Sequence, residues 1–162
     1  MPQTHEPQPL DRLLREHKFF AGLDPEHLTL LVGCARNTVF PAGAFMFREA
    51  GPADEFFLIR DGVLALEVTG PGQGPITVQT LVAGDVVGFS WLIERNHRWQ
   101  FDGRVVERIR ALELDGVCLR AKCEADPRLG YELMRRFAGL ASDRLQATRL
   151  QLLDVYGHAY PS

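Results

Sequence analysis

The chain has 162 residues, of which 46% are hydrophobic and 24% are charged, and its formal net charge at pH 7 is -3. This length fits one domain with a substantial core, and the slight negative charge gives no general attraction to nucleic acid or to an acidic membrane surface. No apolar run approaches the length of a membrane span, and the polar, proline-rich N-terminus lacks the apolar core of a signal peptide.

The cysteines are few and unpaired in sequence. Cys34, Cys118 and Cys123 form no CxxC pair, and an odd, low count is typical of reduced thiols rather than of a disulfide framework. We therefore expect free thiols and a cytoplasmic location.

The N-terminal part of the chain predicts a flexible tail over residues 1–8 and then two short helices. The first helix is expected from residue 9 to residue 17, and Gly22 ends the segment that follows it. The second runs from residue 24 to residue 33, because Asp24-Pro25 supplies an N-cap and a proline at the first helical position.

Residues 36–114 predict a β-structure, because short runs rich in Val, Phe, Ile and Leu alternate there with glycine and proline. Asp61-Gly62, between two such runs, indicates a two-residue hairpin, since glycine adopts a positive φ without steric cost. The spacing predicts an α+β fold that is mainly β, with an eight-stranded antiparallel β-roll or jelly roll. The expected strands lie near 37–40, 44–48, 55–60, 63–69, 76–81, 86–88, 98–106 and 109–114.

Two further helices are predicted after Asp115. A short one spans residues 116–124, and Asp126-Pro127 begins a long one that runs over 127–156 with one apolar face, followed by a tail over 157–162. At ~1.5 Å per residue the long helix spans about 40 Å, which is more than a small roll can cover. A second copy of the chain is the simplest partner for the overhanging part, so we expect a homodimer formed through this helix.

The segment from Gly84 to Val106 is the candidate ligand-binding cassette. It predicts a strand end, a tight glycine turn, a short helix at 89–93, a loop and a strand that begins near Arg98. Free backbone N–H groups at a helix start can hold an anion, and an arginine can close over it.

Several segments resemble, in order, the signatures of the cyclic nucleotide-binding domain superfamily. They are Phe20-Ala-Gly-Leu23, Pro41-Ala-Gly43, Phe47-Arg-Glu-Ala-Gly51, Phe57-Leu-Ile-Arg-Asp-Gly62-Val-Leu-Ala-Leu and Gly84-Asp-Val-Val-Gly88. The resemblance covers residues 17–156 and includes the bacterial catabolite-activator and anaerobic-regulator branch. It implies a non-enzymatic regulatory module with a cyclic nucleotide, cAMP or cGMP, as its ligand.

The ligand residues depart from that family's pattern. In nucleotide-binding members a Glu that accepts the ribose hydroxyl follows the glycine, whereas this chain has Phe89 after Gly88. A buried sugar hydroxyl left unpaired there would cost about 1–3 kcal/mol. The position of the phosphate arginine falls on Arg98 or on Trp99, depending on the strand register.

These alternatives predict different pockets. With Arg98 inward a phosphate contact survives; with Trp99 inward the pocket is lined by aromatic rings, which suits a flatter or more apolar ligand, or no ligand. On the long helix, Asp143 and Arg144 lie where the resemblance places base contacts. The full set of candidate ligand-binding residues is Gly88, Phe89, Ser90, Trp91, Arg98, Trp99, Gln100, Asp143 and Arg144.

The C-terminal end resembles the hinge of the transcription-factor branch, over Leu150-Gln-Leu-Leu-Asp154-Val-Tyr156. Only Gly157-His-Ala-Tyr-Pro-Ser162 follows, and six residues cannot build a helix-turn-helix, so we expect a stand-alone domain without one and no sequence-specific DNA binding by this chain alone. No membrane contact is expected, and an unidentified protein partner remains open.

An enzyme is not indicated. Of the five histidines only His97 borders a predicted strand, which is too few for the metal site of a cupin barrel, and no nucleophile elbow, Walker loop or His-Glu-x-x-His helix is present. We therefore predict no catalytic and no metal-binding residues. Two hypotheses remain: a ligand-sensing regulatory module, or a ligand-independent interaction module whose pocket is filled by its own aromatic side chains.

Overall fold

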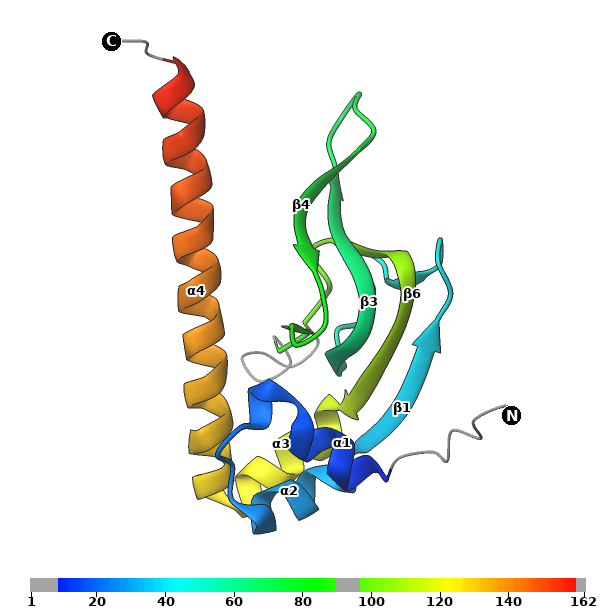
Figure 1. The fold of residues 1–162 in the computed structure, drawn as a ribbon, viewed down its shortest axis with the longest axis vertical. Helices are drawn as coiled ribbons and strands as arrows, with labels where there is room; N and C mark the ends of the chain where they lie inside the picture. The colour runs from blue at the N-terminus through cyan, green and yellow to red at the C-terminus, as the bar shows by residue number, and fades with distance from the viewer. Residues whose placement is uncertain (1–8, 90–96, 160–162) are drawn as a thin grey trace, which may run out of the picture.

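The computed structural model describes residues 9–89 and 97–159, of which the last two are described by backbone alone. Figure 1 shows the strands β1, β6, β3 and β4 side by side, with α1, α2 and α3 gathered at one end of the sheet and α4 rising beside it. The elements in chain order are α1 (Leu10–Glu16), the 3-10 helix η1 (Lys18–Phe20), α2 (Pro25–Val32), β1 (Ala35–Phe40), β2 (Phe45–Phe47), β3 (Glu55–Thr69), β4 (Pro75–Leu81), β5 (Val86–Val87), β6 (Asp102–Asp115), α3 (Gly116–Ala125) and α4 (Pro127–Ala159).

Aspartate side chains begin three of the helices. Asp24 accepts a hydrogen bond from the Glu26 N–H at the start of α2, with Pro25 as the first helical residue. Asp126 accepts bonds from two N–H groups in the first turn of α4, and Asp115 does the same for α3. These bonds satisfy backbone donors that have no partner inside a helix. The capped starts predicted at Asp24 and Asp126 are confirmed, and α4 extends to Ala159, beyond the predicted end at residue 156.

The sheet is antiparallel in the order β1-β6-β3-β4, with β2 paired to β6 and β5 paired to β3. Among the described residues this makes six strands rather than the eight predicted. The difference arises because the runs at 55–60 and 63–69 form the single strand β3, and residues 102–115 form the single strand β6. The predicted strand start near Arg98 is an isolated bridge to Pro52 instead.

The predicted hairpin at Asp61-Gly62 is wrong. Both halves of β3 pair with β6, and the register shifts between Ile59 and Asp61 and again between Asp61 and Leu64. Gly62 has a φ of 99°, and a Cβ there would lie 2.1 Å from the Arg108 carbonyl oxygen. The positive φ that indicated a turn therefore serves a bulge, which bends the strand without reversing it.

Two hydrophobic clusters lie on the opposite faces of β3. Phe56 and Leu58 belong to the cluster formed with the helices, whereas Phe57 and Ile59 belong to the cluster inside the roll. Successive side chains of a strand point to opposite faces, so one apolar run supplies both clusters.

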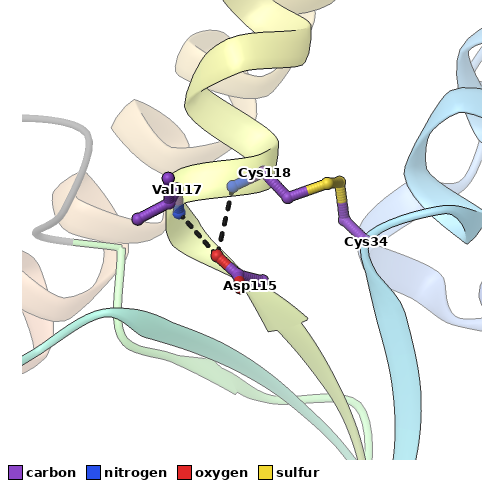
Figure 2. Close-up of a disulfide and its surroundings, with 4 residues drawn as sticks. All are labelled: Cys34, Asp115, Val117 and Cys118. Carbon is purple, nitrogen blue, oxygen red and sulfur yellow. Dashed lines mark hydrogen bonds between the residues drawn. A yellow bond between two sulfur atoms is a disulfide. The ribbon is translucent and has the colours of Figure 1, made fainter.

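A disulfide joins Cys34, directly before β1, to Cys118 in the first turn of α3, and Figure 2 shows the same turn capped by Asp115. The two cysteines are 84 residues apart in sequence, and their Cα atoms are 5.6 Å apart. The expectation of three free thiols is therefore wrong for this pair. Cys123 is the free cysteine, and burial raises the pKa of its thiol.

The two halves of α4 differ in their surroundings. Leu129, Leu133 and Phe137 are buried in the helical cluster, and the Arg136 guanidinium donates hydrogen bonds to the Phe19 and Ala21 carbonyl oxygens. In the second half the large apolar side chains are exposed, namely Leu145, Leu150, Leu152, Leu153, Val155 and Tyr156. The predicted overhang of this helix is confirmed. No helix in the described part of the chain is long and apolar enough to cross a membrane.

Candidate ligand-binding site

The candidate site is a pocket of about 260 Å³ between the end of β5, the segment 97–101 and α4. Its lining combines aromatic and aliphatic side chains with two guanidinium groups. The lining residues are Val87, Gly88, Phe89, His97, Arg98, Trp99, Gln100, Phe101 and Arg144.

Two larger cavities lie elsewhere in the described part of the chain. One of about 670 Å³ beside the disulfide is lined by four carboxylates, and its one arginine, Arg36, is already engaged by Glu113 at 2.9 and 3.0 Å. Burial and the neighbouring carboxylates raise the pKa of Glu55 there, so that cavity disfavours an anion. The other, of about 450 Å³, lies between α2 and the start of α4. The pocket at the glycine turn lies in the segment predicted as the ligand-binding cassette, and it is the candidate for an anionic ligand.

Gly88 allows the close packing on which the pocket depends. Its φ is 96°, and a Cβ there would lie 2.4 Å from the Glu55 carbonyl oxygen and 2.7 Å from the Trp99 ring. Both distances are shorter than any side chain could tolerate. Glycine at this position thus lets β5 approach β3 and lets the Trp99 ring lie directly against the backbone.

Trp99 is the member of the pair 98–99 that faces the interior of the roll. Its side chain is buried and stacks on Phe47, with ring centroids 3.7 Å apart and planes 8° apart. Two backbone hydrogen bonds fix it, one from the Ala50 N–H to the Trp99 carbonyl oxygen and one from the Trp99 N–H to the Gly51 carbonyl oxygen. The sequence left Arg98 and Trp99 as alternatives, and the structure places the aromatic ring inward.

Arg98 lies at the exposed rim of the pocket. Its Nη1 is 3.4 Å from the Ala50 carbonyl oxygen, which is a long contact. Gln100 is also exposed, and His97 is half-buried beside it. Arg98 is thus available to a ligand only from the solvent side.

Arg144 reaches the pocket from α4. Its guanidinium donates a hydrogen bond to the carbonyl oxygen of Val86, the first residue of β5, and its Cζ lies 5.6 Å from the centre of the Phe89 ring. Burial lowers the pKa of this group, and the nearby Asp85 carboxylate acts in the opposite direction. A half-buried cation in this setting gains stability from an anion that replaces lost hydration.

Phe89 turns toward α4. Its ring stacks on Phe137 with centroids 5.2 Å apart and planes 23° apart, and Arg144 lies over the ring. The position that the resemblance assigns to a ribose-binding Glu is therefore part of the contact between the cassette and α4. A phenyl ring cannot accept the hydrogen bond that a carboxylate would accept.

Of the three remaining predicted site residues, the structure describes Asp143 alone. Asp143 is exposed and does not line the pocket. Ser90, Trp91 and most of the predicted helix at 89–93 fall outside the described residues. The sequence did not indicate two contributors: the Val86 carbonyl group, since any residue supplies one, and Phe47, whose contact with Trp99 spans 52 positions along the chain.

The chemistry that this pocket offers is binding. Apolar walls with a small number of placed polar groups are typical of small-molecule sites. Among the described residues no group of three or more His, Cys, Asp or Glu side chains is placed to hold a metal ion.

Comparison with known proteins assigns the central part of the chain to a family. The cyclic nucleotide-binding domain family matches residues 37–126, more than half of the chain and including the Gly88 turn and the segment 97–101.

Two curated relatives match nearly the whole chain. A cyclic nucleotide-gated ion channel of Arabidopsis thaliana, number 18, is 31% identical over 154 residues, which are 91% of this chain and 20% of the channel. The CRP-like cAMP-activated global transcriptional regulator of Mycobacterium tuberculosis is 23% identical over 146 residues, which are 90% of this chain and 63% of the regulator. The chain thus spans less than two thirds of either relative.

Solved structures agree on the fold. A proposed cyclic nucleotide-binding protein from Geobacter metallireducens superimposes with a TM-score of 0.73 at 29% identity, covering 85% of this chain and 98% of that chain. A cyclic nucleotide-binding domain from Methylobacillus flagellatus gives a TM-score of 0.74 at 19% identity, covering 88% of this chain and 80% of that chain. The second likeness bears on the fold alone.

Proposed function

Because the chain belongs to the cyclic nucleotide-binding domain family, we propose that it is a non-enzymatic regulatory module that senses a small anionic ligand in the pocket at Gly88 and relays binding through α4. The observation that carries this proposal is the contact of Arg144 with the Val86 carbonyl group and the Phe89 ring. One side chain of the long helix is thereby part of the pocket lining, so a ligand that engages it acts on α4 directly.

The relay requires two arrangements of α4 that differ in ligand affinity, because a ligand shifts an equilibrium only by its differential affinity for the two states. In the arrangement described here Arg144 is held by a carbonyl oxygen. An anion in the pocket would offer the same guanidinium a charge-assisted bond of roughly twice the strength. Exchange of one partner for the other is the switch that we propose.

We propose that the output is a homodimer formed through the exposed half of α4. Leu145, Leu152 and Tyr156 recur at intervals of seven and four residues, and each is at least 53% exposed. At helical spacing they share one face, which a second copy of the same helix can cover. A further protein partner could use the same face.

A charge placed on this face tests the homodimer. Leu145→Glu combined with Leu152→Glu should convert a dimer to a monomer in sedimentation velocity, because a buried like-charge cluster opposes association. The matched control is Ala147→Glu combined with Gln151→Glu, which adds the same charge to the opposite side of the helix and should leave the dimer intact. A wild-type chain that is monomeric at all concentrations would contradict the proposal.

The ligand-independent interaction module remains the second candidate. The observation that favours it is the stacking of Trp99 on Phe47, which fills the roll interior next to Gly88 with the chain's own rings. In this case the pocket would only be the outer edge of a packed core, and α4 would act without a ligand.

Titration with cAMP and cGMP is the first experiment, with tryptophan fluorescence and melting temperature as readouts. A ligand that binds only the native state raises the melting temperature, by an amount that corresponds to about 2.7 kcal/mol at a concentration of 100 Kd. A saturable change with either nucleotide, or with another small anion, supports sensing. If the wild-type chain responds to no anion, the result contradicts sensing and supports the ligand-independent interaction module.

The cytoplasmic location belongs to the proposal as well. It no longer rests on the cysteines, since Cys34 and Cys118 form a disulfide, and cytoplasmic disulfides are usually transient or redox-sensing. Alkylation of thiols at the moment of cell lysis shows whether this pair is a disulfide or two reduced thiols in the cell. Sequence-specific DNA binding by this chain is not part of the proposal.

A further inference from the structure

We infer that the pocket selects a small aromatic monoanion, such as an aryl carboxylate, over a cyclic nucleotide, with Arg144 as its anion-binding residue and with Trp99, Phe101 and Val87 as its apolar walls. This inference rests on the proposed sensing function and names the class of ligand for the same site.

The wall formed by Trp99 is fixed before any ligand arrives. The ring is buried against Phe47 on one side and against the Gly88 backbone on another, and backbone hydrogen bonds to Ala50 and Gly51 hold the residue from both ends. A preformed wall costs no side-chain ordering on binding. An apolar ring in the pocket loses the water on its own surface, which is the main source of binding energy for such a ligand.

The partly buried cation of the pocket lies on α4 rather than in the segment 97–101. Arg144 is half-buried, lies over the Phe89 ring and donates to a neutral carbonyl oxygen, that of Val86. Burial lowers the pKa of the group, which means that its charge is stabilised less well than in water. A carboxylate is the partner that restores this stabilisation, since its two oxygens match the geometry of a guanidinium.

A cyclic nucleotide meets the opposite conditions. Its sugar hydroxyl needs an acceptor where Phe89 stands, and the described lining residues include no carboxylate. The family's pattern pairs the phosphate with an inward-facing arginine at this point of the chain, yet Arg98 is exposed at the rim and Trp99 takes the inward place.

Calorimetric titration with matched probes tests the inference. Phenylacetate and indole-3-acetate carry the ring and the anion, phenylacetamide carries the ring without the charge, and acetate carries the charge without the ring. We expect saturable binding of the two aryl acids, with a Kd at least about 10-fold lower than for phenylacetamide or acetate, because both the wall and the cation contribute. Cyclic AMP should bind at least about 10-fold more weakly than the better aryl acid.

Two variants separate the two arginines. Arg144→Gln keeps a donor for the Val86 carbonyl group but removes the charge, and it should raise the Kd for the aryl acids about 10-fold or more. Arg98→Gln removes the charge at the rim and should change that Kd less than about 3-fold. The comparison of acid with amide in the wild-type chain needs no variant, so it decides the question even if Arg144→Gln does not fold.

The outcomes separate this inference from the proposed function. Tighter binding of cAMP or cGMP than of the aryl acids would support sensing but overturn the aryl-anion assignment. Equal binding of acid and amide, or a larger loss in Arg98→Gln than in Arg144→Gln, would overturn the role of Arg144. No binding of any probe or nucleotide would overturn both.

Discussion

The two halves of α4 carry a similar spacing of apolar side chains but meet different surroundings. Leu133 and Phe137 are at most 4% exposed, whereas Leu145 is 63% and Leu152 is 53% exposed. Spacing therefore identifies an apolar face of a helix but not what covers that face. The first, attached half belongs to the core of the domain, whereas the second, projecting half extends away from the helices α1, α2 and α3 with its large apolar side chains exposed (Figure 1).

The largest expected effect comes from breaking the attached half at Phe137. Its ring contacts those of Phe19, Phe56 and Phe89, with centroid distances of 5.1–5.2 Å. Phe137→Ala should lower the free energy of unfolding by about 3–5 kcal/mol, since it removes a buried ring and leaves a cavity. Urea denaturation followed by circular dichroism measures this loss.

The matched control is Leu150→Ala in the projecting half. Leu150 is 67% exposed and lies away from the face that carries Leu145 and Leu152, so its truncation should change the free energy of unfolding by less than about 0.5 kcal/mol. Comparable losses in the two variants would show that the projecting half also packs on this domain, and the contrast between the halves would fail.

The second-largest expected effect comes from removing the disulfide next to the attached half. The Cys34–Cys118 disulfide holds the first turn of α3, from which the chain continues into α4 (Figure 2). Replacing both cysteines by serine should cost about 2–4 kcal/mol, because the bond closes a long loop in the unfolded chain. Hydrogen exchange should rise in α3 and around Phe137 and stay unchanged beyond Leu145.

Cys123→Ser is the control for that pair, since Cys123 forms no disulfide. This substitution should leave most of the free energy of unfolding unchanged. If dithiothreitol changes the melting temperature of the double serine variant as much as that of wild type, the disulfide is not what the reductant acts on.

The features predicted correctly from the sequence are those set by neighbouring residues. The helix starts at Asp24 and Asp126 follow from a cap and a proline that act within one turn, and the overhang of α4 follows from its length. The tight turn expected at Gly88 is present, with a φ of 96°. These signals need no knowledge of distant parts of the chain.

The features that were missed depend on distant partners. Gly62 indicates a positive φ, but whether that makes a hairpin or a bulge depends on Arg108 in β6. The pairing of Cys34 with Cys118 depends on how β1 lies relative to α3. The inward direction of Trp99 depends on a one-residue register, which its stacking on Phe47 fixes. For the candidate site the sequence supplied Arg144 and both register alternatives, while the choice between them needed the fold.

The smallest expected effect is a dependence of stability on pH that acts only where the first half of α4 packs on the domain. The His17 side chain is buried; its Nε2 lies 3.2 Å from the Ile59 carbonyl oxygen and its Nδ1 accepts a hydrogen bond from the Phe19 N–H. Phe19 in turn packs on Phe137 in α4. Protonation of Nδ1 would make it a donor that faces the Phe19 N–H, which is also a donor. The loss of this hydrogen bond would loosen η1, against which the first half of α4 packs.

The direction follows from the pKa of His17. Burial lowers it, and the positive charges of Lys18 and Arg60 act in the same direction, while the bond to Ile59 and the Asp85 carboxylate oppose them. Because the unfolded chain takes up this proton first, the contribution to stability is complete above about pH 6.5 and declines as the pH falls below it. His17→Gln, which can still donate to the Ile59 carbonyl oxygen, should flatten this part of the profile of melting temperature against pH. An identical decline in the variant would assign the effect to another group, and a decline that spreads to hydrogen exchange beyond Leu145 would break the contrast between the two halves of α4.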